Sequence, residues 1–240
     1  MSESIRQHEL AGAVRHFEFD RPGVRNALGQ REYVFLAERF EAAAADGCKA
    51  VVLSGRGASF CAGNELAEFE TAWPQPPHGP VYRFLAALAA CPCPVIAAVH
   101  GAAVGIGATM LLHCDVIVSR SDAFLAYPFV KLGISVEGGS SLLLPARVGY
   151  LRAMDIVLTA RKVGAPEALR LGLVSEVIDG DAVERALALA HQVAQYRSDA
   201  VAATKRQLRA PFAAQAPRVF EDEVQAINAL IVRQRAERAP

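Results

Sequence analysis

The chain has 240 residues, of which 52% are hydrophobic and 21% charged, a balance typical of one globular domain rather than a disordered chain. Its 25 basic and 25 acidic residues cancel, which argues against a nucleic-acid partner, because such proteins carry an excess of positive charge. The N-terminal residues lack the apolar segment of a secretory signal, and no apolar run is long enough to span a membrane. We therefore expect a cytoplasmic protein with no membrane partner.

The first half of the chain predicts short strands that alternate with glycine-rich loops and helices. Alternating polarity predicts a strand over 13–19, and helical spacing of apolar residues predicts a helix over 30–45. A unit of strand, glycine loop and helix recurs around 51–70 and 95–113, which indicates an α/β protein built from repeated ββα or βα units. Further strands are expected at 50–54, 95–99 and 115–118, and further helices at 81–90 and 107–113.

Beyond about residue 145 the strand pattern fades and helical spacing dominates. Helices are expected at 146–160, 166–171, 181–196, 198–209 and from about 217 onward. No Pro/Ser-rich linker separates the two parts, so we predict one continuous domain, with an α/β core over 1–190 and a helical extension over 191–240.

The proline-rich segment 71–80 has no regular structure in this prediction, because proline removes a backbone donor and fixes φ. Two interpretations stay open, a mobile surface loop and a lid or pocket wall that contains Trp73. The five cysteines follow neither zinc-ligand nor redox-pair spacing, so we expect buried thiols and no metal site. They are Cys48, Cys61, Cys91, Cys93 and Cys114.

Two glycine-rich loops, 60–66 and 100–107, each follow a predicted strand. Backbone N–H groups at such turns can hold a phosphate or a developing oxyanion, although glycine can also merely permit a tight turn. Gly101, Gly105 and Gly107 miss the dinucleotide-binding spacing, and no Walker lysine follows them.

Glu137 lies in a third glycine-rich turn, over 132–141. It can complement a helix dipole as a first-turn acid, or it can act as a catalytic base. Two amide donors and one carboxylate suit removal of a proton next to a carbonyl group.

In chain order, seven motifs resemble the enoyl-CoA hydratase/isomerase (crotonase) superfamily, and their common order makes the resemblance specific. They are Asp20-Arg21-Pro22 with Arg25-Asn26-Ala27-Leu28, residues 50–55, Phe60-Cys61-Ala62-Gly63, residues 94–101, Cys114-Asp115, Leu171-Gly172-Leu173-Val174, and Lys205. The resemblance implies a crotonase-like spiral of ββα units with a helical C-terminal trimerisation region, and a homotrimer or homohexamer. It also implies an acyl-CoA thioester as substrate and no separate cofactor, because coenzyme A is part of the substrate.

The resemblance assigns the backbone N–H groups of Asn64 and Ile106 to an oxyanion hole. For Lys205, a phosphate contact and a solvated helix lysine both stay open. The residues implied in binding the substrate or coenzyme A are Arg25, Ala27, Leu28, Ala62, Gly63, Asn64, Glu65, Leu66, Gly105, Phe129 and Lys205.

Two positions that depart from the family pattern reduce the number of reactions that the sequence allows. Hydratases of the family carry two glutamates at positions that are Thr109 and Phe129 here, and neither side chain can do carboxylate acid–base work. Pro128-Phe129 followed by Glu137 instead resembles the Δ3,Δ2-enoyl-CoA isomerase branch, in which this glutamate is the single catalytic base. The alternatives are another crotonase-type enzyme (a hydratase, dehalogenase or thioester hydrolase) and a catalytically silent acyl-CoA binder.

Overall fold

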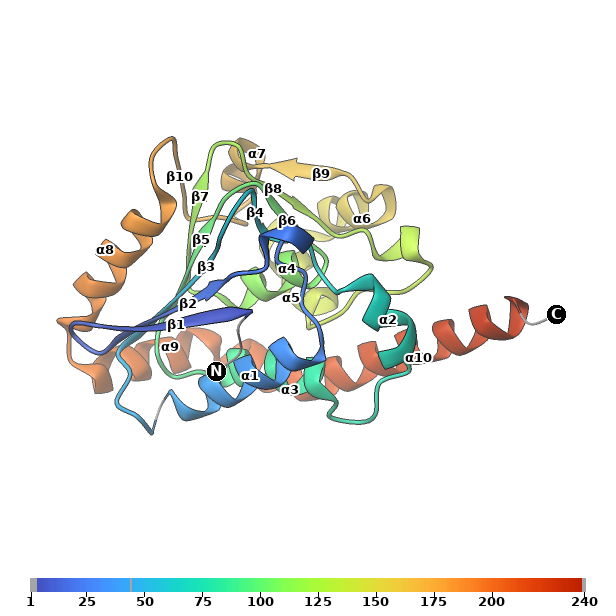
Figure 1. Cartoon of the computed structure of the whole chain (residues 1–240), viewed down its shortest axis with the longest axis horizontal. Helices are drawn as coiled ribbons and strands as arrows, with labels where there is room; N and C mark the ends of the chain where they lie inside the picture. The colour runs from blue at the N-terminus through green and yellow to red at the C-terminus, as the bar shows by residue number, and fades with distance from the viewer. Residues whose placement is uncertain (1–3, 44, 239–240) are drawn as a thin grey trace.

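The computed structural model describes residues 4–43 and 45–238. A six-stranded sheet forms its main layer, in which β1 and β2 pair antiparallel and the other neighbours pair parallel (Figure 1). Parallel strands are covered on both faces, which explains why β3 and β5 are continuous, fully buried runs. The sheet order is β1 (Ile5–Leu10), β2 (Val14–Phe19), β3 (Ala50–Gly55), β5 (Val95–Val99), β7 (Val116–Arg120) and β10 (Glu176–Ile178).

A second sheet of four short strands lies against the first. The strands β3, β5 and β7 of the large sheet are each followed, within a few residues, by one strand of the small sheet. This repeated step between two sheets confirms the predicted α/β spiral of ββα units. The small sheet has the order β4 (Ser59–Cys61), β6 (Ala102–Val104), β8 (Phe124–Ala126) and β9 (Lys162–Gly164).

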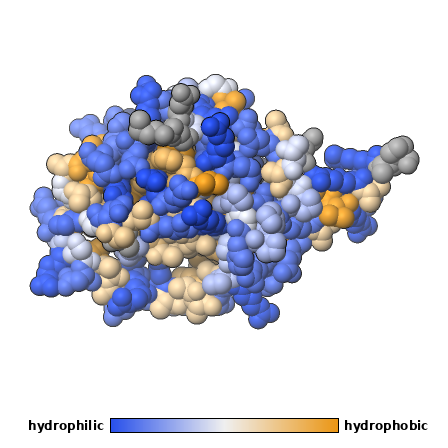
Figure 2. Space-filling view, turned by 60° about the horizontal axis from the view of Figure 1, so that its bottom comes forward, coloured by the Kyte–Doolittle hydropathy of each residue, from blue (hydrophilic) through white to orange (hydrophobic). Residues whose placement is uncertain are grey.

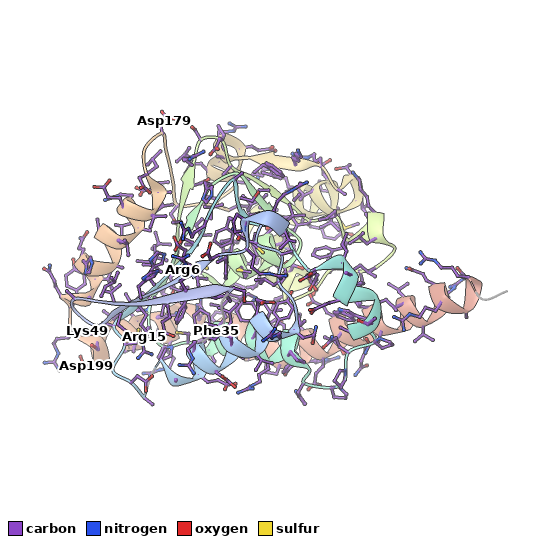
Figure 3. All side chains as sticks on the ribbon, viewed as in Figure 1. Arg6, Arg15, Phe35, Lys49, Asp179 and Asp199 are labelled. Carbon is purple, nitrogen blue, oxygen red and sulfur yellow. The ribbon has the colours of Figure 1, made fainter. Side chains whose placement is uncertain are left out.

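Helices cover both faces of the large sheet (Figure 1). On one face lies α8 (Ala182–Ala194), whose alanines recur every fourth residue and pack against alternate residues of β2, β3, β5 and β7. On the other face lie α1 (Gln30–Ala42) and α3 (Pro80–Ala90). Lys49, just before β3, reaches the C-terminal end of α8, where its ammonium group donates to Ala194 O at 3.1 Å (Figure 3).

The C-terminal helices α9 (Ser198–Ala213) and α10 (Ala216–Arg238) run beneath the core, and the end of α10 projects from the body. Figure 2 shows mainly hydrophilic side chains beside a small hydrophobic patch on this projection. The expected boundary at 190/191 falls inside α8, which belongs to the sheet layers, so the helical extension begins at α9.

Several elements differ from the sequence prediction. Gly149, with φ +81°, splits the helix expected at 146–160 into α5 (Ser140–Val148) and α6 (Tyr150–Thr159). The helix expected at 107–113 is α4 (Ile106–Thr109) followed by a 3₁₀ turn. The prediction lacked the strands β1, β4, β6, β8, β9 and β10. The helix α2 (Leu66–Ala72) lies at the end of the strand–loop–helix unit expected around 51–70, and α7 (Ala165–Arg170) lies where a helix was expected.

The proline-rich segment 71–80 is tied to α10. Gln75 exchanges two hydrogen bonds of 2.8 Å with the Asn228 amide, and Arg235 donates to Trp73 O at 2.6 Å. The Trp73 side chain is buried against Phe69. Pro74, Pro76 and Pro77 are exposed, while the Trp73 indole joins the core.

All five cysteines are buried and free, as expected. Within the described residues, no helix is long and apolar enough to cross a membrane. The same residues contain no group of three or more His, Cys, Asp or Glu side chains that could hold a metal ion.

Candidate active site

The two glycine-rich loops meet at Gly63 and Gly105. β4 and β6, which precede these glycines, pair parallel with Cys61 opposite Ala103. A Cβ atom on Gly63 would lie 2.9 Å from Val104 O, and the two glycines have φ of +103° and +54°. Only glycine allows this backbone contact without strain, so the contact brings the residues that follow, Asn64 and Ile106, to one junction.

The Asn64 N–H group points away from Leu28, the residue with which Asn64 forms a β-bridge. Leu28 donates its N–H to Gly63 O at 2.8 Å and accepts from Glu65 N at 2.9 Å, which makes a parallel bridge around Asn64. In such a bridge the central residue directs its own N–H to the opposite side.

Ile106 is the first residue of α4, and Gly105 accepts the first helical bonds, from Ala108 N and Thr109 N. The first N–H groups of a helix have no partner within it. The junction therefore presents two backbone donors, at Asn64 and Ile106, of the kind that hold a developing oxyanion.

Glu137 is 3% exposed, and neither of its carboxylate oxygens has a hydrogen-bond partner among the described residues. Burial raises its pKa to about 8, with a further contribution from the negative charge of Glu223. The side-chain amide of Asn64, which lies near the carboxylate without meeting hydrogen-bond geometry, lowers it. A buried carboxylate left without partners is costly to the fold, which marks it as a candidate functional group.

Polar groups and apolar walls surround this carboxylate. The Tyr33 hydroxyl donates to Asn64 Oδ1 at 2.5 Å, and the pKa of Tyr33 is raised by burial and by the charge of Glu137. A Cβ atom on Gly138 would lie 2.6 Å from the Thr109 methyl and 2.8 Å from Leu85. Thr109 thus packs on the turn that carries Glu137 and offers no carboxylate there.

The turn that carries Glu137 is fixed by several contacts. Gly138 and Gly139 both have positive φ, and Ser140 donates from its hydroxyl to Glu137 O at 2.5 Å. His113 Nε2 donates to Gly138 O at 2.7 Å. Upstream, Phe129 is buried, and its carbonyl accepts from Ile134 N at 3.1 Å.

The remaining residues implied in ligand binding form a rim beside the first loop. Arg25 is exposed, and its carbonyl accepts from Ala62 N at 2.9 Å. Ala27 is buried behind it, and Leu66 is 65% exposed at the start of α2. Glu65 is held by an ion pair with Arg21 at 2.7 Å, which engages its carboxylate.

Comparison with known proteins matches this geometry to one family. A family model described as "Enoyl-CoA hydratase/isomerase" matches residues 9–239. The chain belongs to the enoyl-CoA hydratase/isomerase family. It is 34% identical over 218 residues to a probable enoyl-CoA hydratase of Rhodobacter capsulatus, covering 88% of this chain and 83% of that protein.

Two further relatives show the breadth of the family. The human mitochondrial Delta(3,5)-Delta(2,4)-dienoyl-CoA isomerase is 34% identical over 221 residues, covering 85% of this chain and 67% of that protein. The crystal structure of an enoyl-CoA hydratase/isomerase from Pseudoalteromonas atlantica superposes with a TM-score of 0.90 at 33% identity, covering 99% of both chains. Hydratases and isomerases thus share this fold, and side chains must decide between them.

Lys205 lies apart from the two loops of this crotonase-type site. Its buried ammonium group forms an ion pair with Asp115 at 2.7 Å and donates to Cys93 O at 2.6 Å. The solvated-lysine interpretation is wrong because the side chain is only 8% exposed. Because its ammonium group is engaged within the chain, we leave Lys205 out of the site proposed below.

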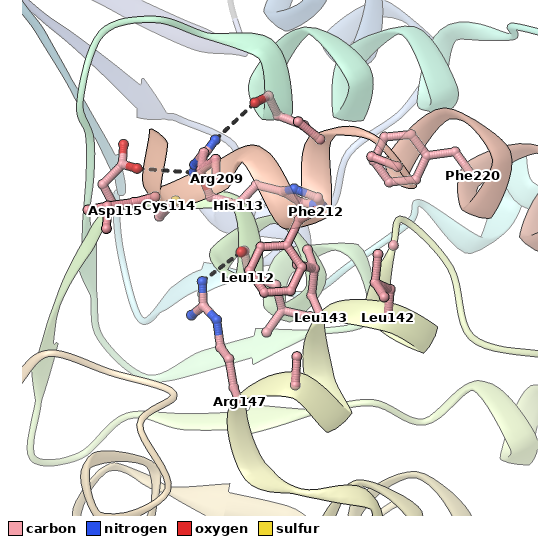
Figure 4. Close-up of a pocket in the computed structure, with 16 residues that line it drawn as sticks. Leu112, His113, Cys114, Asp115, Leu142, Leu143, Arg147, Arg209, Phe212 and Phe220 are labelled. Atoms are coloured by element: carbon pink, nitrogen blue, oxygen red, sulfur yellow. Dashed lines mark hydrogen bonds and ion pairs between the residues drawn. The ribbon is translucent and has the colours of Figure 1, made fainter. Parts of the chain in front are cut away.

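A cavity of about 260 Å³ lies behind the turn that carries Glu137, between α5, α9 and α10 (Figure 4). Two arginines at its wall donate to main-chain carbonyls, Arg147 to Leu112 O at 2.6 Å and Arg209 to Ala89 O at 2.9 Å. The cavity includes Gly139 but not Glu137, so it is distinct from the candidate site.

Two residues at the crotonase-type site were missed by the sequence analysis. Tyr33 lies within the helix predicted over 30–45, and the apolar spacing of that helix does not indicate a polar role for its hydroxyl. Glu223 comes from α10, far along the chain from Glu137, and no local pattern marks a contact across that separation.

Proposed function

We propose that the protein is a Δ3,Δ2-enoyl-CoA isomerase that moves a C3–C4 double bond of an acyl-CoA thioester to C2–C3. The observation that carries this proposal is the solitary Glu137 carboxylate, buried and without a hydrogen-bond partner in the described chain. A raised pKa makes this carboxylate a stronger base than an exposed glutamate.

The chemistry needs one base and one oxyanion hole. The Glu137 carboxylate removes a proton from C2, and the electrons of that C–H bond move toward the thioester oxygen. The resulting dienolate is held by the N–H groups of Asn64 and Ile106. Protonation at C4 by the Glu137 acid, as the electrons return, forms the C2–C3 double bond, and the base is regenerated without net change.

Hydration would require a second carboxylate to handle water, and the positions of Thr109 and Phe129 do not supply one. Two other carboxylates lie nearby, and both are engaged within the chain. Arg21 pairs with Glu65, and the amides of Gly139 and Ser141 donate to Glu223. The single-base isomerisation therefore fits the side chains better than hydration does.

The substrate part of the proposal is a coenzyme A thioester whose carrier lies along the rim of the first loop. This rim includes the exposed Arg25 and Leu66 and the backbone around Ala62 and Gly63. Gly105 lies where the two loops meet. No separate cofactor takes part in this reaction, and we place the enzyme in cytoplasmic fatty acid metabolism.

Assembly as a homotrimer or homohexamer is also part of the proposal. One surface of α6 supports it, because Tyr150, Leu151 and Leu158 are 68%, 80% and 61% exposed. Large apolar side chains grouped on one helix are typical of an interface. Light scattering on the purified protein tests it, and a monomer at micromolar concentration would contradict this part.

Product analysis of the purified enzyme tests the activity. A 3-enoyl-CoA should give the conjugated 2-enoyl thioester, followed by its ultraviolet absorbance, whereas crotonyl-CoA should undergo little hydration. A 3,5-dienoyl-CoA is run beside them, because one relative is named a dienoyl-CoA isomerase. Rapid hydration without double-bond migration would contradict the proposal, and tight binding of all thioesters without turnover would identify a silent binder.

A further inference from the structure

The C-terminal helix α10 reaches the turn that carries Glu137 through one buried side chain. Glu223 is 5% exposed, and its carboxylate accepts from Gly139 N at 2.6 Å through Oε2 and from Ser141 N at 2.9 Å through Oε1. Both amides lie within four residues of Glu137 along the chain. One carboxylate from a distant helix therefore holds both amides.

Helix α5 cannot cap its own N-terminus, because its N-cap residue is Gly139, which has no side chain. Unpaired N–H groups at a helix start need acceptors, and negative charge is favourable there. Glu223 supplies both from another element. Burial raises the pKa of its carboxyl, whereas the hydrogen bonds from Ser141 and Gly139 act against that rise and favour the charged form. The serines at 140 and 141 do not cap this helix start with their side chains, and the Ser140 hydroxyl donates to Glu137 O.

Packing fixes Glu223 in this position. One turn earlier in α10, Phe220 contacts the rings of Tyr82 and His113, with centroid distances of 5.8 and 5.7 Å. A Cβ atom on Gly139 would lie 2.7 Å from the Phe220 ring. The next buried residue of α10, Ile227, joins the main core. The carboxylate of Glu223 therefore has little freedom to leave the turn.

The groups facing Glu137 come from several elements. Tyr33 of α1 and Cys61 of β4 are neutral near pH 7, because burial raises the pKa of Tyr33 and raises that of Cys61 to about 12. His113, behind the turn, is also neutral, since burial lowers its pKa to about 4. Two cations, Arg147 and Arg209, lie on the far side of that histidine, beside the cavity of Figure 4.

We infer that Glu223 is a positioning residue for the isomerisation, which holds the Glu137 turn through two backbone amides and strengthens the base by its negative charge. This inference rests on the proposed function only in naming Glu137 as the base. The C-terminal helix then completes the active site of its own chain.

Two substitutions separate the effect of the two hydrogen bonds on the Glu137 turn from the effect of the negative charge of Glu223. Glu223→Gln removes the charge and leaves one acceptor for two amides, whereas Glu223→Asp keeps the charge but shortens the reach by one methylene. Glu221→Gln is the matched control, because Glu221 is exposed on the same helix. We expect both Glu223 variants to lower kcat by roughly 10- to 100-fold, with KM changed by less than about threefold, and the control to match wild type.

A carboxyl-carbon NMR titration of Glu137, assigned with Glu137→Gln, reads the effect of the charge without using activity. Glu223→Gln should move the midpoint toward the range of an exposed glutamate, and Glu223→Asp should leave it raised. A role in stability alone would lower the melting temperature of Glu223→Gln while leaving its titration midpoint and kcat unchanged, which would overturn the inference.

The two proposals fail in different ways. If wild type does not isomerise 3-enoyl thioesters but the Glu137 midpoint still moves in Glu223→Gln, the proposed function fails and the charge effect of Glu223 stands. If wild type isomerises but neither Glu223 variant changes kcat or the midpoint, the positioning role is refuted and the isomerase assignment survives. Should Glu223→Gln not fold, Glu223→Asp still tests the holding role through kcat.

Discussion

At the scale of single residues, the site is defined by a carboxylate that is unfavourable for the folded state. Glu137 is buried and has no hydrogen-bond partner among the described residues, and burial raises its pKa to about 8. Proteins commonly retain such groups where activity needs them. The same residue therefore predicts both a pH dependence of catalysis and a pH dependence of stability.

The pH profile of kcat/KM should report Glu137. Because the base must be ionised, kcat/KM should rise with pH through a midpoint near 8 in wild type. Initial rates from pH 5 to 9.5 measure this midpoint, with enzyme stability checked at each pH. A midpoint between 4 and 5 would mean that the carboxylate is solvated during turnover and would contradict the site described above.

Stability should respond in the opposite sense. Since the folded-state pKa is raised from 4.5 to about 8, the folded state holds the proton more tightly than the unfolded state. Stability present below pH 4.5 is therefore lost progressively as the pH rises through 8. Glu137→Gln removes this loss. The free energy of unfolding of the variant, relative to wild type, should therefore grow by on the order of 2–4 kcal/mol between pH 5 and pH 8.

Urea unfolding of both proteins at the two pH values measures this difference. The exposed Glu221→Gln serves as a control, which should show no pH-dependent advantage. Equal changes in Glu137→Gln and wild type would show that Glu137 titrates as an ordinary surface glutamate.

At the scale of elements, the site depends on the backbone contact between the two glycine-rich loops. Gly63→Ala would place a methyl 2.9 Å from Val104 O at a φ of +103°. We expect the loops to separate, stability to fall by about 1–3 kcal/mol and kcat to fall by roughly 100-fold as the donors move apart.

Gly23→Ala is the matched control, because its Cβ would meet no atom within 4 Å and its φ is not positive. Kinetics and thermal unfolding of the two variants test the contact. Normal kcat in Gly63→Ala would show that the junction does not place the oxyanion donors.

Elements with strong local patterns were predictable, and those made by distant contacts were not. The sequence predicts β3, β5 and the glycine loops after them because these elements depend on the types of their own residues, which are runs of apolar residues followed by glycines. The strands β9 and β10 have three residues each, too short for a periodic signal. They form only because other strands offer an edge.

The same distinction applies within the site. Glu137 and the loops that carry Asn64 and Ile106 could be picked out from the sequence because each lies in a short motif. The contact from Glu223 and the ion pair of Lys205 with Asp115 arise from the folding of α9 and α10 back onto the core. A partner many residues away leaves no spacing pattern from which it could be read.

In the whole molecule, one chain supplies both the core that positions the two glycine-rich loops and a C-terminal helix, α10, that packs against this core. α10 contacts the segment 71–80, the turn of Glu137 and the helix α3. The fold belongs to the enoyl-CoA hydratase/isomerase family, and within it the choice between isomerisation and hydration depends on a few side chains.

The role of Glu137 as the single base is tested most directly by the rate of double-bond migration in Glu137→Gln beside Glu65→Gln, measured by ultraviolet absorbance with a 3-enoyl-CoA. If Glu137 is the single base, its variant should lose roughly 10²–10⁴-fold in kcat, while Glu65→Gln should keep most of its activity. Circular dichroism should confirm that both variants are folded. Near-normal turnover by a folded Glu137→Gln, or loss of activity only in Glu65→Gln, would contradict the account.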